Sequence, residues 1–217
     1  MIDCASSLKR AYIPYVVPFV VFAVCIYVAP LFNFSQSLMY PLKTVLVAVA
    51  LFYYRNAYKQ EIKFSFDWLS VLSGVFVFLL WILPEGLYPQ IGYSEFNPYE
   101  HASGYNVYLL IAFRLTGAVF IVPFMEELFW RSFALRFLIS SDFKSIPLGQ
   151  FSWFSFIFVS LAFGLEHHRW LVGIAAGLVY ASVLYHRKNL FAPILSHATT
   201  NFLLGIYVVS THQWSFW

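Results

Sequence analysis

Long apolar runs separated by short polar segments dominate the sequence. Because the hydrocarbon core of a bilayer is about 30 Å thick, a helix of roughly 20 apolar residues crosses it. The runs predict an all-α fold, a polytopic transmembrane helical bundle. The predicted spans are seven: Tyr12–Phe32, Leu38–Tyr54, Phe66–Leu83, Val107–Phe137, Phe151–Leu165, Leu171–Tyr185 and Leu190–Val209.

Two segments depart from this regular pattern. Val107–Phe137 keeps its helical character beyond its apolar part, and Pro123 predicts a kink within it. Pro84–Asn106 is aromatic, acidic and rich in Pro and Gly, which is typical of a loop or an interfacial helix. An eighth span in Pro84–Asn106 is the alternative, and a role in guiding or covering a substrate is a second interpretation of this segment.

The basic residues predict how the chain is oriented. With the N-terminus in the cytoplasm, the inner segments hold ten of the 13 Lys and Arg, and the outer segments hold one, Arg169. This bias follows the positive-inside rule, and an eighth span would weaken it. Lys43 and Arg114 fall within spans. The inner set is Lys9, Arg10, Arg55, Lys59, Lys63, Arg131, Arg136, Lys144, Arg187 and Lys188.

Composition excludes a soluble or disordered protein. Hydrophobic residues make up 61% and charged residues 11% of the 217 residues, against about 25% charged residues in an average soluble domain. The net charge of +3 is small and dispersed, so no nucleic acid partner is expected. We predict one integral membrane domain over 1–217, surrounded by lipid, with a motif-bearing core at about 107–209. The sequence carries no signal for its oligomeric state.

The first candidate site is a pair of adjacent glutamates in an apolar helix, Glu126 and Glu127. Glu127 and Arg131 are four residues apart, so they share a helix face and can pair. Glu126 lies about 100° around the helix and can act as a base. The alternative interpretation is that both glutamates only mark the cytoplasmic end of the helix.

Two later segments carry further polar groups. His167 ends the fifth span, four residues after Phe163 and between Glu166 and His168. His197 and Asn201 are four apart in an uncharged span, so they project together where lipid satisfies neither. An interfacial histidine and an interhelical hydrogen-bond pair are the simpler readings.

Taken together, these groups suit peptide hydrolysis. Glu126 and His167 can deprotonate a water, while His197 and Asn201 can donate hydrogen bonds to the oxyanion. A zinc site made by Glu126, His167 and His197 is an alternative, because zinc takes His nitrogen and carboxylate oxygen. Asn201 would be an unusual fourth ligand, so we expect no metal cofactor.

Two non-hydrolytic functions are the alternatives to peptide hydrolysis. A bacteriocin-immunity or scaffold protein of the same fold would be non-catalytic and would tolerate loss of Glu126. A proton-coupled transporter is disfavoured, because neither an inverted repeat nor a pair of interrupted helices is visible.

The three motifs resemble those of the CPBP family of intramembrane proteases, which includes the CAAX prenyl endopeptidases of the Ras-converting type. The family pattern EExxxR, FxxxH and HxxxN is met, in order, by Glu126-Glu127 with Arg131, Phe163 with His167, and His197 with Asn201. The resemblance covers roughly 119–204. The approach Val122-Pro123-Phe124-Met125 is similar to a bacterial subgroup found beside exosortase sorting systems.

The resemblance implies an α-helical, CAAX-protease-like endopeptidase of glutamic type, acting on a membrane-anchored peptide or protein. It implies that Glu126 and His167 activate water, that His197 and Asn201 form the oxyanion hole, and that Glu127 and Arg131 support them. The bacterial subgroup implies a bacterial or archaeal inner membrane and makes a prenylated substrate doubtful. The family commonly has eight spans, whereas this chain predicts seven.

Overall fold

The computed structural model describes residues 11–217 except 33 and 93–94. The predicted inner charges Lys9 and Arg10 lie outside the described residues. In the described part every regular element is helical, which agrees with the predicted all-α class. The main helices are α2 (Ile13–Val28), α3 (Gln36–Tyr54), α4 (Trp68–Ile82), α9 (Trp153–Leu165), α10 (Trp170–Arg187) and α11 (Phe191–Thr211).

A long helical rod runs through the middle of the bundle. It consists of α6 (Tyr105–Thr116), α7 (Val122–Glu127) and α8 (Leu135–Phe137), joined by π-helical turns at Gly117–Ile121 and Leu128–Ala134. Pro123 has no N–H for the carbonyl of Val119, which lies in the first π turn. The rod therefore widens near Pro123 and continues. A helix of its 33 residues is longer than the hydrocarbon core of a bilayer is thick.

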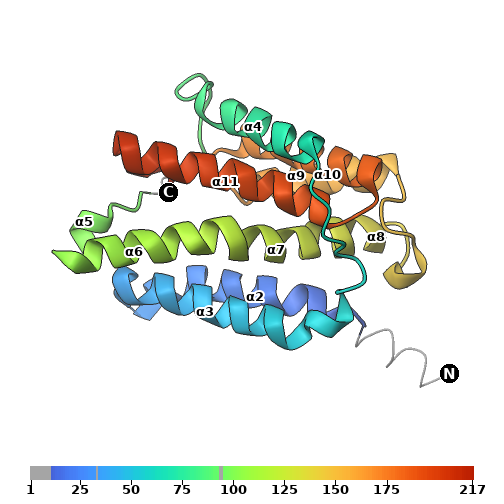
Figure 1. Ribbon diagram of the computed structural model, residues 1–217, viewed down its shortest axis with the longest axis horizontal. Helices are drawn as coiled ribbons and strands as arrows, with labels where there is room; N and C mark the ends of the chain where they lie inside the picture. Colours follow the sequence, from blue (N-terminus) through green and yellow to red (C-terminus); the bar gives the residue numbers. More distant parts are fainter. Residues whose placement is uncertain (1–10, 33, 93–94) are drawn as a thin grey trace.

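The other helices pack on the two sides of this rod. In Figure 1, α2 and α3 lie below it, while α4 and α11 lie above it with α9 and α10 behind. Close packing of α9 on α10 and of α4 on α11 depends on glycine: Gly164 and Gly173 face one another, and Gly74 faces Ser196. These approaches bring the polar residues of α7, α9 and α11 to the bundle interior.

The helices lie at the seven predicted ranges, but not all of them reach the length that a membrane crossing requires. Three are long and apolar enough to cross a membrane: Ser37–Ala57, Tyr105–Phe137 and Phe191–Thr211. Ile13–Val28, Trp68–Ile82 and Trp153–Leu165 are shorter apolar helices. In the described part of 84–104, the longest helix is the four-residue α5 (Pro98–His101), so this stretch is a loop, as the sequence favours over an eighth span.

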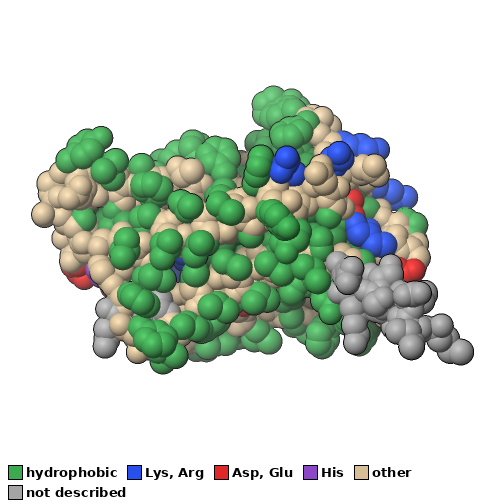
Figure 2. All heavy atoms as spheres, turned by 90° about the horizontal axis from the view of Figure 1, so that it is seen from below, with side chains coloured by type: hydrophobic (Ala, Val, Ile, Leu, Met, Phe, Trp, Pro, Cys, Tyr) green, Lys and Arg blue, Asp and Glu red, His purple; other side chains and the backbone are tan. Residues whose placement is uncertain are grey.

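The surface of the bundle is that of a membrane protein. Large apolar side chains are exposed along its flanks, including Val49, Phe76 and Phe120. Figure 2 shows this apolar flank, with the Lys and Arg side chains gathered at one end. The exposed basic residues on the loops are Arg55, Lys59, Lys63, Lys144, Arg187 and Lys188. Arg131 and Arg136, expected among these inner charges, are instead buried in the bundle.

Candidate functional site

Glu127 is the centre of a buried charged cluster. Its Oε2 lies 3.1 Å from Nε of Arg131, and its Oε1 lies 2.9 Å from Nδ1 of His197. All three residues are almost fully buried, at 0%, 1% and 5% exposure. The predicted pairing of Glu127 with Arg131 is therefore confirmed, and the same carboxylate also holds α11 against α7.

Arg131 is secured on its other sides by α9 and α10. Its Cζ lies 4.2 Å from the ring centroid of Phe163, and its Nη2 donates to the carbonyl of Gly177 at 3.4 Å. A cation over an aromatic face is stabilised most where water is absent. Phe163 thus supports the guanidinium that supports Glu127.

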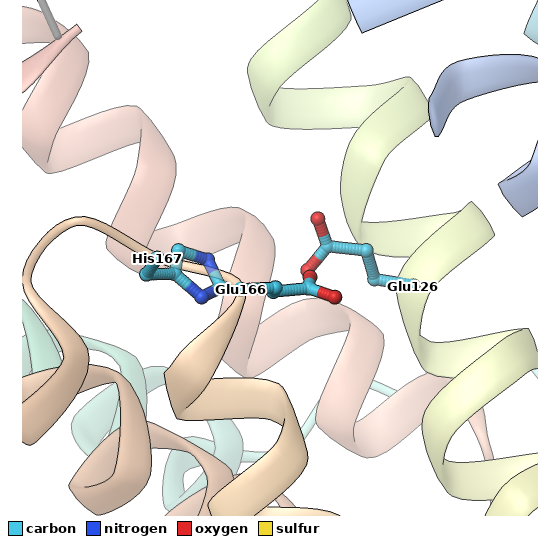
Figure 3. Close-up of side chains that lie close together, drawn as sticks. All are labelled: Glu126, Glu166 and His167. Carbon is cyan, nitrogen blue, oxygen red and sulfur yellow. The ribbon is translucent and has the colours of Figure 1, made fainter. Parts of the chain in front are cut away.

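Glu126 points to a different group of side chains. Figure 3 shows the Glu126 carboxylate of α7 beside Glu166 and His167, which follow the end of α9. The ligand-type atoms of these three residues all lie within 4.8 Å of one another. Glu126 is 5% exposed, and its Oε2 is buried without a hydrogen-bond partner. This oxygen is therefore available to a water or a substrate.

The protonation pattern of His167 follows from its contact with the backbone. Its Nδ1 lies 2.7 Å from the carbonyl oxygen of Phe163, which can only accept. Nδ1 is therefore the N–H nitrogen, and in the neutral ring Nε2 carries a free lone pair. The ring is also held by edge contact with Trp81, at 5.5 Å between centroids. His167 is thus oriented as a base.

His167, His197 and Asn201 line one cavity of about 180 Å³, the first cavity. The amide of Asn201 donates one N–H to the carbonyl of Ala118 at 2.8 Å, which fixes its orientation and leaves a second N–H on the same nitrogen. Tyr180 stacks on His197, at 4.8 Å and 18° between the rings. Two of the motifs therefore meet in one cavity, with Glu126 at its His167 end.

The structure groups the possible metal ligands differently from the sequence. Glu126, Glu166 and His167 form the close cluster, whereas His197, expected as a ligand, is bonded to Glu127 and lies outside that cluster. Two carboxylates, one of them with an unpartnered oxygen, and one imidazole are a donor set that suits zinc with an open position. Glu126, Glu166 and His167 therefore fit a metal better than the predicted set does.

Two residues of this region are not predicted by the sequence motifs. Glu166 lies outside the motifs, and its only signal in the sequence is that it directly precedes His167. Tyr180 carried no signal, because its contact with His197 joins α10 to α11 only in three dimensions.

Comparison with known proteins agrees with the motifs. Residues 106–203 match the family model described as Rce1-like, the type II CAAX prenyl endopeptidases. The match confirms the resemblance and covers the three motif-bearing segments. No curated protein and no solved structure matches the chain.

Proposed function

Since residues 106–203 match the family model of the Rce1-like type II CAAX prenyl endopeptidases, we propose that this protein is an intramembrane endopeptidase hydrolysing a peptide bond of a membrane-anchored substrate. The observation that carries the proposal is that His167, His197 and Asn201 line one cavity, while Glu126 lies beside His167. His167 and the oxyanion donors His197 and Asn201 face the same space. The ligand-type atoms of Glu126 and His167 lie within 4.8 Å of one another.

In this proposal Glu126 and His167 activate the attacking water. The free Oε2 of Glu126 accepts one proton of the water while the water oxygen bonds to the carbonyl carbon, and Nε2 of His167 accepts a hydrogen bond from the remaining O–H. The C–N bond then breaks, and the same proton passes to the leaving amine. Water is added across the peptide bond, so atoms and charge balance.

His197 and Asn201 stabilise the oxyanion. The fixed amide of Asn201 offers its second N–H, and Nε2 of His197 donates when the imidazole is protonated. Oε1 of Glu127 lies 2.9 Å from Nδ1 of His197 and so fixes the orientation of the imidazole ring. Arg131 and Phe163 keep Glu127 in place.

A zinc-dependent version of the same protease is the alternative mechanism. Glu126, Glu166 and His167 would hold the ion, which would supply Lewis-acid polarisation and lower the pKa of a bound water. The metal-free version is favoured by the second pair, which already supplies donors for the oxyanion.

The membrane arrangement belongs to the same proposal. We assign seven crossings to the seven main helical segments, with the basic end and the N-terminus in the cytoplasm of a bacterial or archaeal cell. The uneven exposure of Lys and Arg at one end supports this orientation. Residues 1–217 then form one integral membrane domain around the core at 107–209.

Purified protein in lipid nanodiscs tests the proposal. It is given a fluorogenic peptide carrying a farnesyl anchor, the same peptide with a plain alkyl anchor, and the peptide without an anchor. We expect cleavage at one bond of an anchored peptide, identified by mass spectrometry. A non-catalytic immunity or scaffold protein would cleave none of them.

The same assay distinguishes the glutamic mechanism from the zinc-dependent one. Dialysis against a chelator, followed by elemental analysis, leaves a glutamic protease fully active. A zinc-dependent protease loses activity and regains it when zinc alone is added.

A further inference from the structure

Arg169 is a buried cation that the proposed mechanism does not use. It lies in the turn between α9 and α10, two residues after His167, and is 6% exposed. In the predicted topology it is the one basic residue assigned to the outer segments. Because burying an unpaired charge is costly, a guanidinium at this position needs partners. Its partners come from two segments that are distant in sequence.

Glu85, on the loop that follows α4, binds one side of this guanidinium. Its two carboxylate oxygens accept hydrogen bonds from Nε and Nη2 of Arg169, both at 2.8 Å. Such a bidentate pair fixes the orientation of both groups. Nε1 of Trp170, the next residue, also donates to the carbonyl of Pro89 in the same loop at 2.9 Å. The loop after α4 is therefore held against the turn between α9 and α10.

The other side of Arg169 holds the segment that follows α11. Its Nη1 donates to the carbonyl of Ser215 at 2.8 Å, and its Cζ lies 3.9 Å from the ring centroid of Phe216. The face of an aromatic ring attracts a guanidinium, which adds to the hydrogen bond. One side chain thus connects three parts of the chain: the loop after α4, the turn after α9 and the segment after α11.

The segment after α11 supplies two aromatic residues to the lining of the first cavity, Phe216 and Trp217, here called the aromatic wall. Phe216 is 8% exposed and shares an apolar cluster with Val208 of α11, against which Trp81 of α4 packs. In Figure 1 the segment after α11 lies between α11 and α6, toward the end of the bundle where α6 begins. The aromatic wall therefore closes the first cavity at the end away from the basic loops.

We propose that Arg169 determines substrate specificity by holding the aromatic wall closed to the aqueous phase, so that peptides reach His197 and Asn201 only from lipid. This inference rests on the proposed function. A peptide without an anchor stays in water, and the closed wall denies it entry at this end of the cavity. A membrane-anchored peptide does not need that route. Arg169 thereby selects anchored substrates without touching them.

The partners of Arg169 indicate that its loss releases the wall and leaves the bundle folded. The side chain of Glu85 is 36% exposed, so water can solvate its carboxylate once the arginine is gone. Ser215 and Phe216 belong to a three-residue helical turn beyond the end of α11. The packing of α4 on α11 and of α9 on α10 does not depend on that turn.

Thiol labelling tests the closure without any need for catalysis. Ala118 lines the first cavity, and its carbonyl holds Asn201, so Ala118→Cys reports access to this space. Cys4 and Cys25 are first replaced by serine. The protein in nanodiscs is then treated with a charged methanethiosulfonate reagent, which does not enter lipid. Adding Arg169→Gln should raise the labelling rate at least tenfold.

The matched control is Arg187→Gln, which removes an arginine from an ion pair with Asp67 at the basic end of the bundle. It should label at the parental rate. Arg169→Lys keeps the charge but cannot form the bidentate pair, so it should label at an intermediate rate. If Arg169→Gln does not fold, Glu85→Gln takes its place and should also raise the rate.

Cleavage measures the specificity itself. The readout is the ratio of kcat/KM for the anchored reporter to kcat/KM for the same peptide without an anchor. Arg169→Gln should lower this ratio at least tenfold by admitting the unanchored peptide. The anchored peptide should still be cleaved, because Glu126 and His167 stay in place, whereas an unfolded protein would cleave neither peptide.

A labelling rate that Arg169→Gln leaves unchanged overturns the inference, and so does a ratio that stays at the parental value. A parent protein that cleaves no peptide overturns the proposed function and the specificity role with it. Faster labelling of Arg169→Gln would then still show that Arg169 closes the cavity, so the two failures are distinguishable.

Discussion

Glu126 and Glu127 are adjacent in sequence but belong to different halves of the site. A helix turns about 100° per residue, so their carboxylates leave α7 in different directions. Glu127 is bound by Arg131 and His197, whereas Glu126 faces Glu166 and His167 with one oxygen unpartnered. The first arrangement is structural and the second is available for chemistry.

Removing Glu127 should therefore damage stability as well as activity. Glu127→Ala leaves Arg131 buried without its carboxylate, which costs about 3–5 kcal/mol when one partner of a buried pair is lost. A thermal unfolding scan in detergent measures the effect. Glu100→Ala, an exposed glutamate on α5, is the control and should unfold as the parent does. Equal unfolding temperatures for both variants would contradict the role of Glu127.

Asn201 should affect the rate rather than the fold. Asn201→Ala removes a fixed donor to the oxyanion, and losing one such donor lowers kcat by about 10²–10³. Steady-state cleavage of the anchored reporter should show that fall in kcat with a similar KM. Ser210→Ala, at an exposed site on the same helix, should cleave normally. If Asn201→Ala raised KM alone, the residue would bind substrate and not the oxyanion.

Spacing along one helix was enough to predict some of these contacts and not others. The Glu127–Arg131 pair follows from a separation of four residues. The bond between Glu127 and His197 joins residues 70 apart and depends on how α7 and α11 pack. Such a contact between helices leaves no periodic signal in one sequence, so the sequence could name His197 without naming its partner.

At the level of whole helices, glycine sets how closely α11, which carries His197 and Asn201, approaches α4. A Cβ placed on Gly74 would lie 2.3 Å from the backbone oxygen of Ser196 and 2.7 Å from Cβ of Thr199. Ser196 directly precedes His197. The position of the donor pair is therefore coupled to the absence of a side chain on α4.

Gly74→Ala should force α4 and α11 apart. Because the clash involves backbone, we expect overpacking to lower the free energy of unfolding by about 1–3 kcal/mol. Cleavage should fall as well, since His197 moves with its helix. Denaturant titration and the reporter assay measure both, with Ser73→Ala on the same helix as the matched control. Parent-like values for Gly74→Ala would show that the helices adapt without cost.

Across the whole molecule, Glu61 connects distant parts of the chain at the basic end of the bundle. It accepts hydrogen bonds from Tyr15 of α2 at 2.8 Å, from Arg136 of α8 at 3.0 Å and from Lys144 at 3.0 Å, and also from Ser132. Burial opposes ionisation, but Arg136, Ser132 and Lys144 together hold the pKa of Glu61 below its ordinary value. One loop carboxylate thus connects α2 with α8.

The direction of this pKa shift predicts an acid-sensitive contribution to stability. A carboxyl whose folded pKa is below its unfolded pKa stabilises the protein above the unfolded value, about 4.3, and loses that contribution as pH falls through the folded value. The unfolding temperature of Glu61→Gln should therefore lie below that of the parent at pH 7. The gap should narrow as pH is lowered toward 3. A gap that stays constant would show that the charge of Glu61 is not what stabilises the fold.

The architecture was largely predictable from the chain, because lipid demands long apolar helices and charges are scarce. The positions of all seven main helical segments followed from that constraint. The Glu61 network did not, since its partners come from three separate parts of the chain, α2, the long rod and the loop before α9, and none lies at helical spacing from Glu61.

The central claim is that the free carboxylate of Glu126 activates water for peptide hydrolysis. The most direct test is the kcat of Glu126→Gln on the anchored reporter, with its unfolding temperature measured in the same preparation. Glutamine is isosteric but cannot take a proton, and general-base catalysis contributes about 10²–10⁴-fold. We predict a kcat lower by at least about 100-fold with an unchanged unfolding temperature. A variant that cleaves as fast as the parent would contradict the account.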